Sequence, residues 1–237
     1  MKKYLLMALF GLFAVLPTEA QVYRNSRYYN PNSDRLDYSR SHRYGHRSTG
    51  NYWMTGDTYF GLRVGPSFAT VSSDDPYLDG SSMKTGLNVG VAAGFAVAPR
   101  SPLFFETGLY YTEKGGKGNS GQTKFTYNLD YLELPLVLKY KLPIDGGTTI
   151  EPFLGGYVAC GVGGKIKDFG EHAAYSSFSD HPYSFQRFDG GLKLGCGIAY
   201  DLFYADISYE HGLANISHDD FETSRNNALM LTVGLNF

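Results

Sequence analysis

The chain has 237 residues, a formal net charge of −2, and a high content of 29 glycines, 20 tyrosines and 16 phenylalanines. After residue 20 no run approaches the roughly 18 apolar residues of a transmembrane helix, which excludes a helical membrane protein. The slightly negative mean hydropathy is compatible with a membrane β-barrel, because only every second residue of a barrel strand faces lipid.

The N-terminus has the pattern of a secretory signal peptide. Two lysines precede an apolar run over residues 4–16, and Thr18 and Ala20 occupy the −3 and −1 positions of a cleavage site before Gln21. The run is too short to cross a bilayer as a helix, so we predict a signal peptide over residues 1–20. Export excludes nucleic acid as a partner.

Residues 21–56 form a second region, which contains six arginines against Asp34 and Asp37 and almost no aliphatic residues. Such a segment cannot bury enough apolar surface to offset the entropy lost on ordering. We therefore expect a disordered, basic, Tyr/Arg-rich periplasmic segment. Its simplest interpretation is a solvated linker, and the alternative is a contact for an anionic periplasmic partner.

From residue 57 onward, apolar residues recur at every second position between clusters of glycine, aspartate, serine and proline. This is the pattern of β-strands separated by turns. We predict that residues 57–237 form an all-β domain, an antiparallel up-and-down transmembrane β-barrel. It has eight strands, or ten if the long connection 163–184 hides two more. The eight segments lie near residues 60–68, 87–97, 105–111, 131–140, 148–161, 192–200, 203–209 and 229–237.

Ten charged residues fall on the face opposite the apolar stripes when the phase of each segment is set from apolar residues alone. Glycines share this face, as at Gly90 and Gly94 or at Gly195 and Gly197, which a crowded interior requires. The pattern indicates an apolar exterior and a small, polar, filled interior. We expect an ion-pair core, and the alternative is a proton or substrate pathway. The ten residues are Arg63, Glu106, Glu133, Lys139, Glu151, Arg187, Asp189, Lys193, Asp206 and Glu210.

The connections between the eight segments alternate in length. Those after the first, third, fifth and seventh segments are long, whereas the other three are short. Outer-membrane barrels have short periplasmic turns and long outer loops. We therefore expect a protein of a Gram-negative outer membrane with both termini in the periplasm.

Four segments resemble the PorT-like family of outer-membrane β-barrel proteins: FFETGLYYTEKGG (104–116), YLELPLVLKY (131–140), PFLGGYVAC (152–160) and FDGGLKLGCGIAYDL (188–202). The resemblance covers about residues 58–237 and implies an eight-stranded barrel of the OmpA/OmpX type in the outer membrane. The founding member is tied to a protein-secretion system, and most relatives have no defined activity. The terminal segment also resembles the signal that barrel assembly machinery reads. Its outward residues are Leu229, Leu231, Val233, Leu235 and Phe237.

Cys160 and Cys196 belong to a chain expected in an oxidising compartment. We expect residues whose numbers sum to about 347 to face each other across the fifth and sixth segments. This places Cys160 opposite Arg187 and Cys196 opposite Glu151, with the sulfurs on the order of 30 Å apart at about 3.3 Å per residue. We therefore predict no disulfide and two small apolar fillers on the lipid face.

His211 ends the outward stripe of the seventh segment, with Ser208, Glu210 and His218 nearby in sequence. Outer-leaflet lipid hydrolases use a serine, a histidine and an acid at such a position. However, Ser208 and Glu210 are expected to point inward while His211 points outward. We therefore predict no enzymatic activity, and an outer-leaflet lipid-modifying enzyme is the alternative.

The predicted loops contain no recognised metal or cofactor motif. Residues 218–222 and the aspartates Asp74, Asp75 and Asp79 are interpreted as solvated acidic loop tips. Loop 163–184 mixes tyrosine, phenylalanine, serine and histidine, a composition suited to adaptable contacts. We expect a non-enzymatic scaffold or surface-interaction protein, and a further alternative is an accessory of a secretion or envelope complex. Its expected partners are outer-membrane lipid, barrel assembly machinery, and a periplasmic or extracellular protein.

Overall fold

The computed structural model describes residues 57–73, 80–99, 101–120, 123–144, 147–168, 174–179, 184–217 and 223–237. The predicted signal peptide, the basic segment 21–56 and both acidic loop tips lie outside the described residues. Within the described ranges, no helix is long and apolar enough to cross a membrane.

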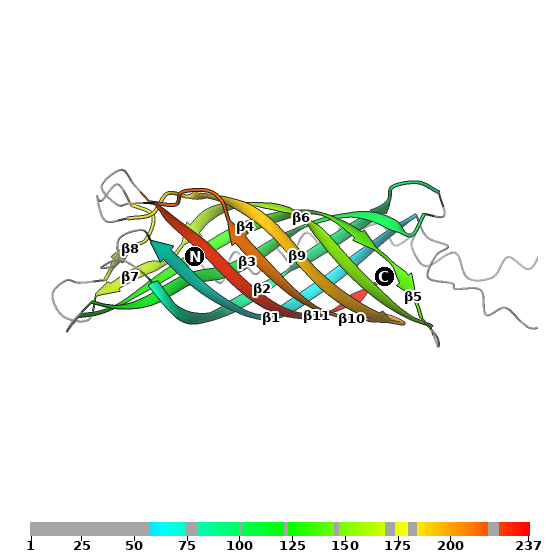
Figure 1. Cartoon of the computed structure of the whole chain (residues 1–237), viewed down its shortest axis with the longest axis horizontal. Coiled ribbons are helices and arrows are strands. Elements are labelled where there is room, and N and C mark those ends of the chain that lie inside the picture. Colours follow the sequence, from blue (N-terminus) through cyan, green and yellow to red (C-terminus); the bar gives the residue numbers. More distant parts are fainter. Residues whose placement is uncertain are drawn as a thin grey trace, which may run out of the picture. The chain divides into compact units, whose positions relative to one another are not determined.

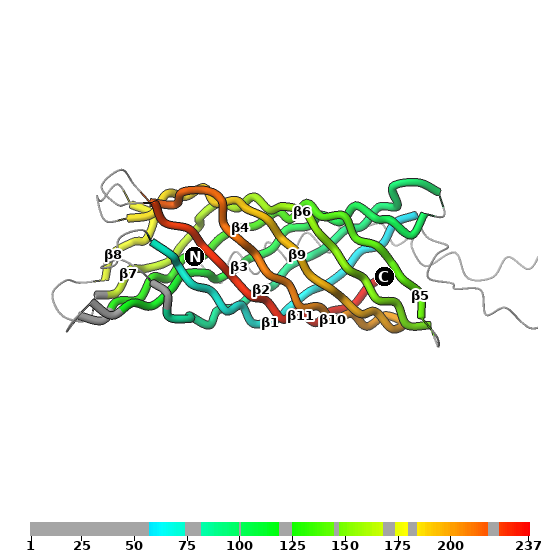
Figure 2. The backbone as a smooth tube through the Cα atoms, in the orientation of Figure 1, coloured from blue at the N-terminus to red at the C-terminus, as the bar shows by residue number. Residues whose placement is uncertain are grey.

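Eight long antiparallel strands close into a barrel (Figure 1), which confirms the predicted all-β, up-and-down fold. Neighbours along the chain pair with each other, and the ring is closed where the last strand pairs with the first, side by side in Figure 2. The barrel strands are β1 (Thr58–Ser73), β2 (Gly80–Ala96), β3 (Leu103–Ser120), β4 (Thr123–Tyr140), β6 (Thr148–Gly163), β9 (Phe188–Tyr200), β10 (Phe203–Gly212) and β11 (Ser224–Asn236).

The stagger of the strands follows from the pairing registers. From Val64 on β1, the registered partners through β11, β10 and β9 lead to Ile150 on β6. The partners in the other direction, through β2, β3 and β4, lead to Cys160 on the same strand. The difference, 160 − 150, is a shear of ten residues. Eight strands with this stagger tilt steeply and enclose an interior that side chains fill.

Side chains alternate between the two faces of the wall as predicted. Large apolar residues point outward and are exposed, such as Leu154 at 61% and Phe203 at 66%, whereas Glu133, Lys139 and their inward neighbours are buried. Glycines make room for the largest inward rings. A Cβ added to Gly94 would overlap the Tyr59 ring, and one added to Gly197 would lie 2.6 Å from the Tyr204 hydroxyl oxygen.

The cysteines require a correction of the predicted register. Cys160 lies opposite Phe188, and Cys196 lies opposite Pro152, so the paired numbers sum to 348 rather than 347. Directly opposed residues share a face of the sheet, and even-numbered residues face outward on both β6 and β9. The sum must therefore be even. Both cysteines are free and exposed.

At the end of the barrel away from Asp57 and Phe237, here called the long-loop end, β3 and β4 are longer than predicted and continue past the ring. There β7 (Lys165–Asp168) pairs with β4, and β8 (Tyr175–Ser176) pairs with β7. These are the two extended segments suspected in connection 163–184. They lie outside the ring, so the barrel keeps eight strands. A further short strand, β5 (Leu142–Pro143), pairs with β6 at the opposite, short-turn end.

We call the continuation of the wall the extension sheet: residues 115–120 of β3, 123–128 of β4, and strands β7 and β8. Two glycines with positive φ mark where it begins, Gly115 (φ 121°) and Gly164 (φ 134°). A Cβ on Gly115 would overlap the Tyr127 carbonyl, and one on Gly164 would overlap the Asn128 carbonyl. Only glycine fits this backbone at such close approach.

A buried apolar cluster, the apolar cap, fills the long-loop end of the barrel. Its aromatic rings pack edge to face, with 5.5 Å between the centroids of Tyr131 and Phe178 and 5.0 Å between those of Tyr127 and Phe185. Offset and edge contacts of this kind are favourable beyond their buried area. The cap consists of Val71, Tyr127, Leu129, Tyr131, Tyr157, Ala159, Ile166, Phe178, Phe185 and Ile216.

Candidate functional site

Charged side chains of β1, β3, β4, β6, β9 and β10, and that of Lys141 just after β4, form ion pairs inside the barrel in two clusters. Lys84 of β2 is also buried and donates to the Lys114 carbonyl at 3.0 Å. Eight of the ten predicted interior residues belong to the clusters, together with Lys114 and Lys141. The capped cluster, next to the apolar cap, contains Lys114, Glu133, Asp189, Lys193 and Glu210. The open cluster, at the short-turn end, contains Arg63, Glu106, Lys139, Lys141 and Glu151.

The capped cluster is a closed ring of alternating charge. The Lys114 ammonium lies 3.0 Å from Glu133 and 2.6 Å from Glu210. The Lys193 ammonium lies 3.2 Å and 2.6 Å from the same two residues. Each carboxylate therefore bridges both lysines. All four side chains are almost completely shielded from solvent, where such pairs attract strongly but each charge has also lost its hydration.

This ring crosses the whole interior. β3 carries Lys114 and β10 carries Glu210, and three strands separate them in either direction around the barrel. Their 2.6 Å contact therefore joins opposite walls. Asp189 adds a third carboxylate, which accepts hydrogen bonds from two neutral groups. The Asn226 amide nitrogen donates to it at 3.0 Å and the Tyr157 hydroxyl at 3.5 Å. The interior at this depth is occupied by bonded side chains.

The open cluster is centred on Lys139. Its ammonium donates to Glu106 at 2.8 Å and to the Tyr204 hydroxyl at 2.9 Å, and lies 3.6 Å from Glu151. Arg63 lies 4.0 Å from Glu106, donates to the Asn236 side chain at 2.6 Å, and stacks on the Tyr204 ring. The Tyr59 hydroxyl donates to Glu106.

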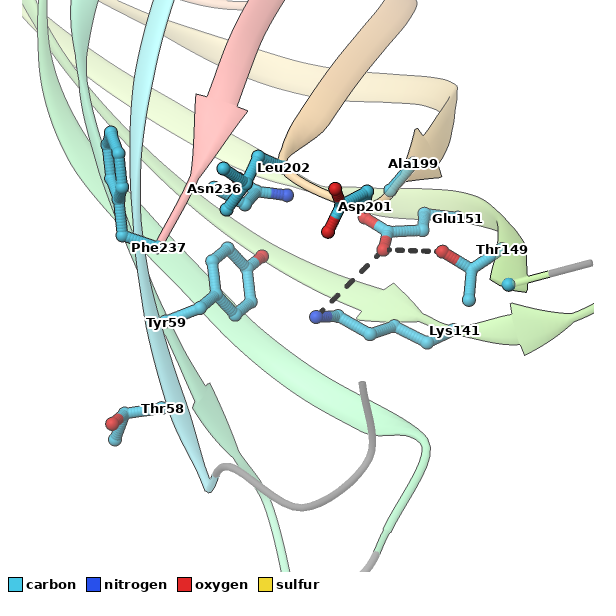
Figure 3. Close-up of a pocket in the computed structure, with 11 residues that line it drawn as sticks. Thr58, Tyr59, Lys141, Thr149, Glu151, Ala199, Asp201, Leu202, Asn236 and Phe237 are labelled. Carbon is cyan, nitrogen blue, oxygen red and sulfur yellow. Dashed lines mark hydrogen bonds and ion pairs between the residues drawn. The ribbon is translucent and has the colours of Figure 1, made fainter. Parts of the chain in front are cut away.

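A pocket of about 200 Å³ leads from the short-turn end to this cluster (Figure 3). In the pocket Lys141 points toward Tyr59 and Glu151, with its ammonium 4.0 Å from the Tyr59 ring centroid and 3.9 Å from Glu151. Lys141 follows the end of β4, and burial lowers the pKa of its ammonium although Glu151 opposes the shift. The pocket ends on the open cluster, since Lys141 and Glu151 line it.

Sequence patterns missed Lys114 and Lys141, although a signal for each was present. Lys114 continues the phase of Glu106, and Lys141 that of Lys139, but each lies beyond the segment predicted to be a strand. The interior tyrosines were missed because tyrosine also occurs in the outer aromatic girdles of barrels, so its presence does not indicate a face. Tyr59, Tyr157 and Tyr204 hydrogen-bond to the clusters, and the Tyr131 hydroxyl accepts from Asn226, which itself donates to Asp189.

Two of the predicted interior residues stay outside the clusters. Arg187 precedes β9, is exposed, and donates to the carbonyls of Gly161 (2.9 Å) and Phe178 (3.2 Å). It has the inward phase, but the wall no longer encloses that position. Asp206 faces the interior half-buried and forms no ion pair with another described residue.

The candidate hydrolase residues are divided by the barrel wall. Ser208 and Glu210 are buried inside, whereas His211 is exposed and its Nδ1 lies 2.7 Å from the Asn227 side-chain oxygen. His218 lies outside the described residues. Among the residues that the structure covers, no group of three or more His, Cys, Asp or Glu is placed to hold a metal ion.

An antiparallel eight-stranded barrel with an apolar exterior and a charged, filled interior is a membrane-spanning β-barrel. The chain belongs to the family described as outer membrane protein beta-barrel domain, whose model matches residues 41–218. It is therefore an outer-membrane protein.

Solved barrels resemble the chain at low sequence identity. A major outer membrane protein from Thermus thermophilus is 16% identical, with 77% of this chain and 100% of that chain covered and a TM-score of 0.48. Neisserial surface protein A is 16% identical (77% and 98% covered, TM-score 0.43), and OprG from Pseudomonas aeruginosa is 12% identical (76% and 95% covered, TM-score 0.41). No curated protein matches the sequence.

Proposed function

We propose that this protein is a non-enzymatic scaffold or surface-interaction protein of the PorT-like type, with its long-loop end outside the cell and both termini in the periplasm. The observation that carries the proposal is the filled interior. The contact between Lys114 and Glu210 joins opposite walls, and the apolar cap covers it. A barrel filled in this way offers its surfaces for contacts rather than its interior for transport.

The surface most suited to contacts lies at the long-loop end. The extension sheet stands beyond the ring and adds polar, exposed side chains such as Ser176, Lys165 and Lys167. The short turns support this orientation, because they lie at the same end of the barrel as Asp57 and Phe237. One of them consists of Asp201 and Leu202. Short turns of outer-membrane barrels are periplasmic.

Site-specific photo-crosslinking in intact cells tests this function. A photoreactive residue at Ser176 is expected to give a discrete adduct with a surface component, and the same residue at Leu202 is not expected to give that adduct. External protease is expected to cut within 163–184 but not within 142–147. The absence of any adduct at the long-loop end, or an ion current through the purified barrel in a planar bilayer, would contradict the proposal.

A second candidate role is that of an accessory in a secretion or envelope complex. The basic segment 21–56 favours it, because its six arginines suit an anionic periplasmic partner. Affinity purification of the full chain and of a chain lacking residues 21–56 tests the role. Loss of a stable partner only on deletion indicates periplasmic assembly through the basic segment, and equal recovery argues against it.

A further inference from the structure

We infer that the outward face of the extension sheet binds the phosphate groups of an outer-leaflet glycolipid through Lys117, Lys165 and Lys167. The inference rests on the orientation given under the proposed function. The carrying observation is that three exposed lysines lie on one face of a sheet, and that this face continues the lipid-facing wall of the barrel.

Strand registers place the three lysines on one face. Lys117 on β3 pairs with Thr126 on β4, and Thr126 pairs with Lys167 on β7, so these residues form one row across three strands. Lys165 lies two residues from Lys167 on the same strand and pairs with Ser176. Directly paired residues share a face. The lysines therefore surround the small polar side chain of Thr126.

Burial distinguishes the two faces of the sheet. Ile166 lies between the two β7 lysines and is buried in the apolar cap, opposite Tyr127. Lys117, Lys165 and Lys167 are all exposed, and none forms an ion pair with a described residue. Their ammonium groups are thus available to an external anion.

The lysine face is continuous with the membrane surface of the wall. Along β4, outward residues run from Leu138 through Leu132, all apolar, and continue through Asp130 and Asn128 to Thr126. The outward side chains therefore change from apolar to polar and charged within a few residues of the end of the apolar band. This is the depth of the lipid headgroups. Lysine side chains reach back toward the membrane from such positions.

Two carboxylates lie between the apolar band and the lysines. Glu113 accepts from the Leu87 backbone N–H (3.3 Å) and the Tyr111 hydroxyl (3.3 Å). Asp130, paired with Glu113 across the strands, is buried. Both carboxylates lie on the barrel side of the lysine row. An anion that approaches Thr126 from outside the barrel therefore meets the ammonium groups first. The hydroxyls of Thr126 and Ser176 add hydrogen-bond donors suited to phosphate oxygens.

A membrane lipid fits this surface better than a soluble polyanion. The face rises directly from the lipid-contacting wall, so a headgroup of a lipid packed on β3 and β4 lies beside it without a separate docking step. Near an anionic membrane each lysine contributes a similar, salt-sensitive increment to binding. A soluble sulfated polysaccharide has the same charge chemistry and is distinguished by the experiment.

The test uses the mature full-length barrel in phosphatidylcholine vesicles that contain lipid A or dephosphorylated lipid A. Lipid A retained per barrel after purification is measured by mass spectrometry for the wild type and for the triple variant K117Q/K165Q/K167Q. Retention is expected to fall by about tenfold or more in the variant. The charge-preserving variant K117R/K165R/K167R is expected to retain lipid A, and heat-modifiable gel migration verifies that each variant is folded.

Equal retention by the glutamine variant, or equal retention of dephosphorylated lipid A by the wild type, would overturn the inference. Displacement of lipid A by a soluble sulfated polysaccharide at lower concentration than by free lipid A micelles would assign the face to a soluble polyanion instead. The vesicle measurement does not depend on cellular orientation or on a protein partner. Its failure is therefore distinguishable from failure of the crosslinking and protease experiments.

Discussion

The two charged clusters inside the barrel use the same side-chain chemistry but differ in their access to water. The capped cluster lies beneath the apolar cap, and its central lysine, Lys114, is fully buried. The open cluster borders the pocket at the short-turn end through Lys141, whose side chain is 11% exposed. Enclosure, rather than the number of ion pairs, should therefore decide how much each charge contributes to stability.

The replacement Lys114→Met gives the largest expected effect. It leaves Glu133 and Glu210 with Lys193 as their only remaining lysine in the ring, so a buried negative charge loses its partner. We expect the free energy of unfolding to fall by about 3–5 kcal/mol. The urea midpoint of unfolding in lipid vesicles measures this loss, with unfolding monitored by heat-modifiable gel migration. A midpoint equal to that of Lys141→Met would contradict the contrast between the clusters.

Gly94→Ala tests whether the packing around the open cluster contributes more to stability than its charges do. The added methyl group overlaps the Tyr59 ring, which bonds to Glu106 and has little room to move. Overpacking of this kind costs about 1–3 kcal/mol. Gly163→Ala is a matched control, because its nearest atom, a side-chain oxygen of Asp130, is 3.3 Å away. Urea unfolding midpoints measure both variants. Equal losses of stability in Gly94→Ala and Gly163→Ala would contradict the idea that the Tyr59 ring leaves no room for a methyl group at position 94.

Lys141→Met is expected to change stability by less than about 1 kcal/mol at neutral pH, because the cost of burying this charge largely offsets its long 3.9 Å ion pair with Glu151. Its effect should depend on pH. Burial lowers the pKa of Lys141 in the folded state, so between that lowered pKa and about 10.4 the unfolded chain binds more protons and wild-type stability rises with pH. Unfolding midpoints measured at increasing pH should therefore rise in the wild type relative to Lys141→Met. A constant difference would contradict this.

His211→Ala lies on the outer face of the wall and outside both clusters, and it gives the smallest expected effect. Since Ser208 and Glu210 point to the other side of the wall, removal of the imidazole should leave the cellular lipid A profile unchanged. Mass spectrometry of lipid A from cells with either protein measures this. An altered profile would favour the lipid-modifying enzyme over the scaffold.

Residues in the middle of strands were predictable, whereas residues at strand ends were not. Lys139 and Lys193 lie within strong alternation, so their inward phase could be counted directly. Lys114 lies beside glycines that resemble a turn in sequence, and pairing with the neighbouring strands keeps that stretch extended. Arg187 has the correct phase but no enclosing wall. Phase is a local property of the chain, but enclosure depends on neighbouring strands.

The sequence by itself determined which residues of the eight predicted segments face outward, because alternation with a period of two depends only on each strand. The choice between eight and ten strands needed the pairing of β7 and β8 outside the ring. Only the tertiary structure decided which inward charges meet. The ten-residue stagger sets the height of every strand against its neighbours, and through it places Lys114 opposite Glu210 and joins β7 to β4. That stagger is a property of the closed ring, and no single strand contains it.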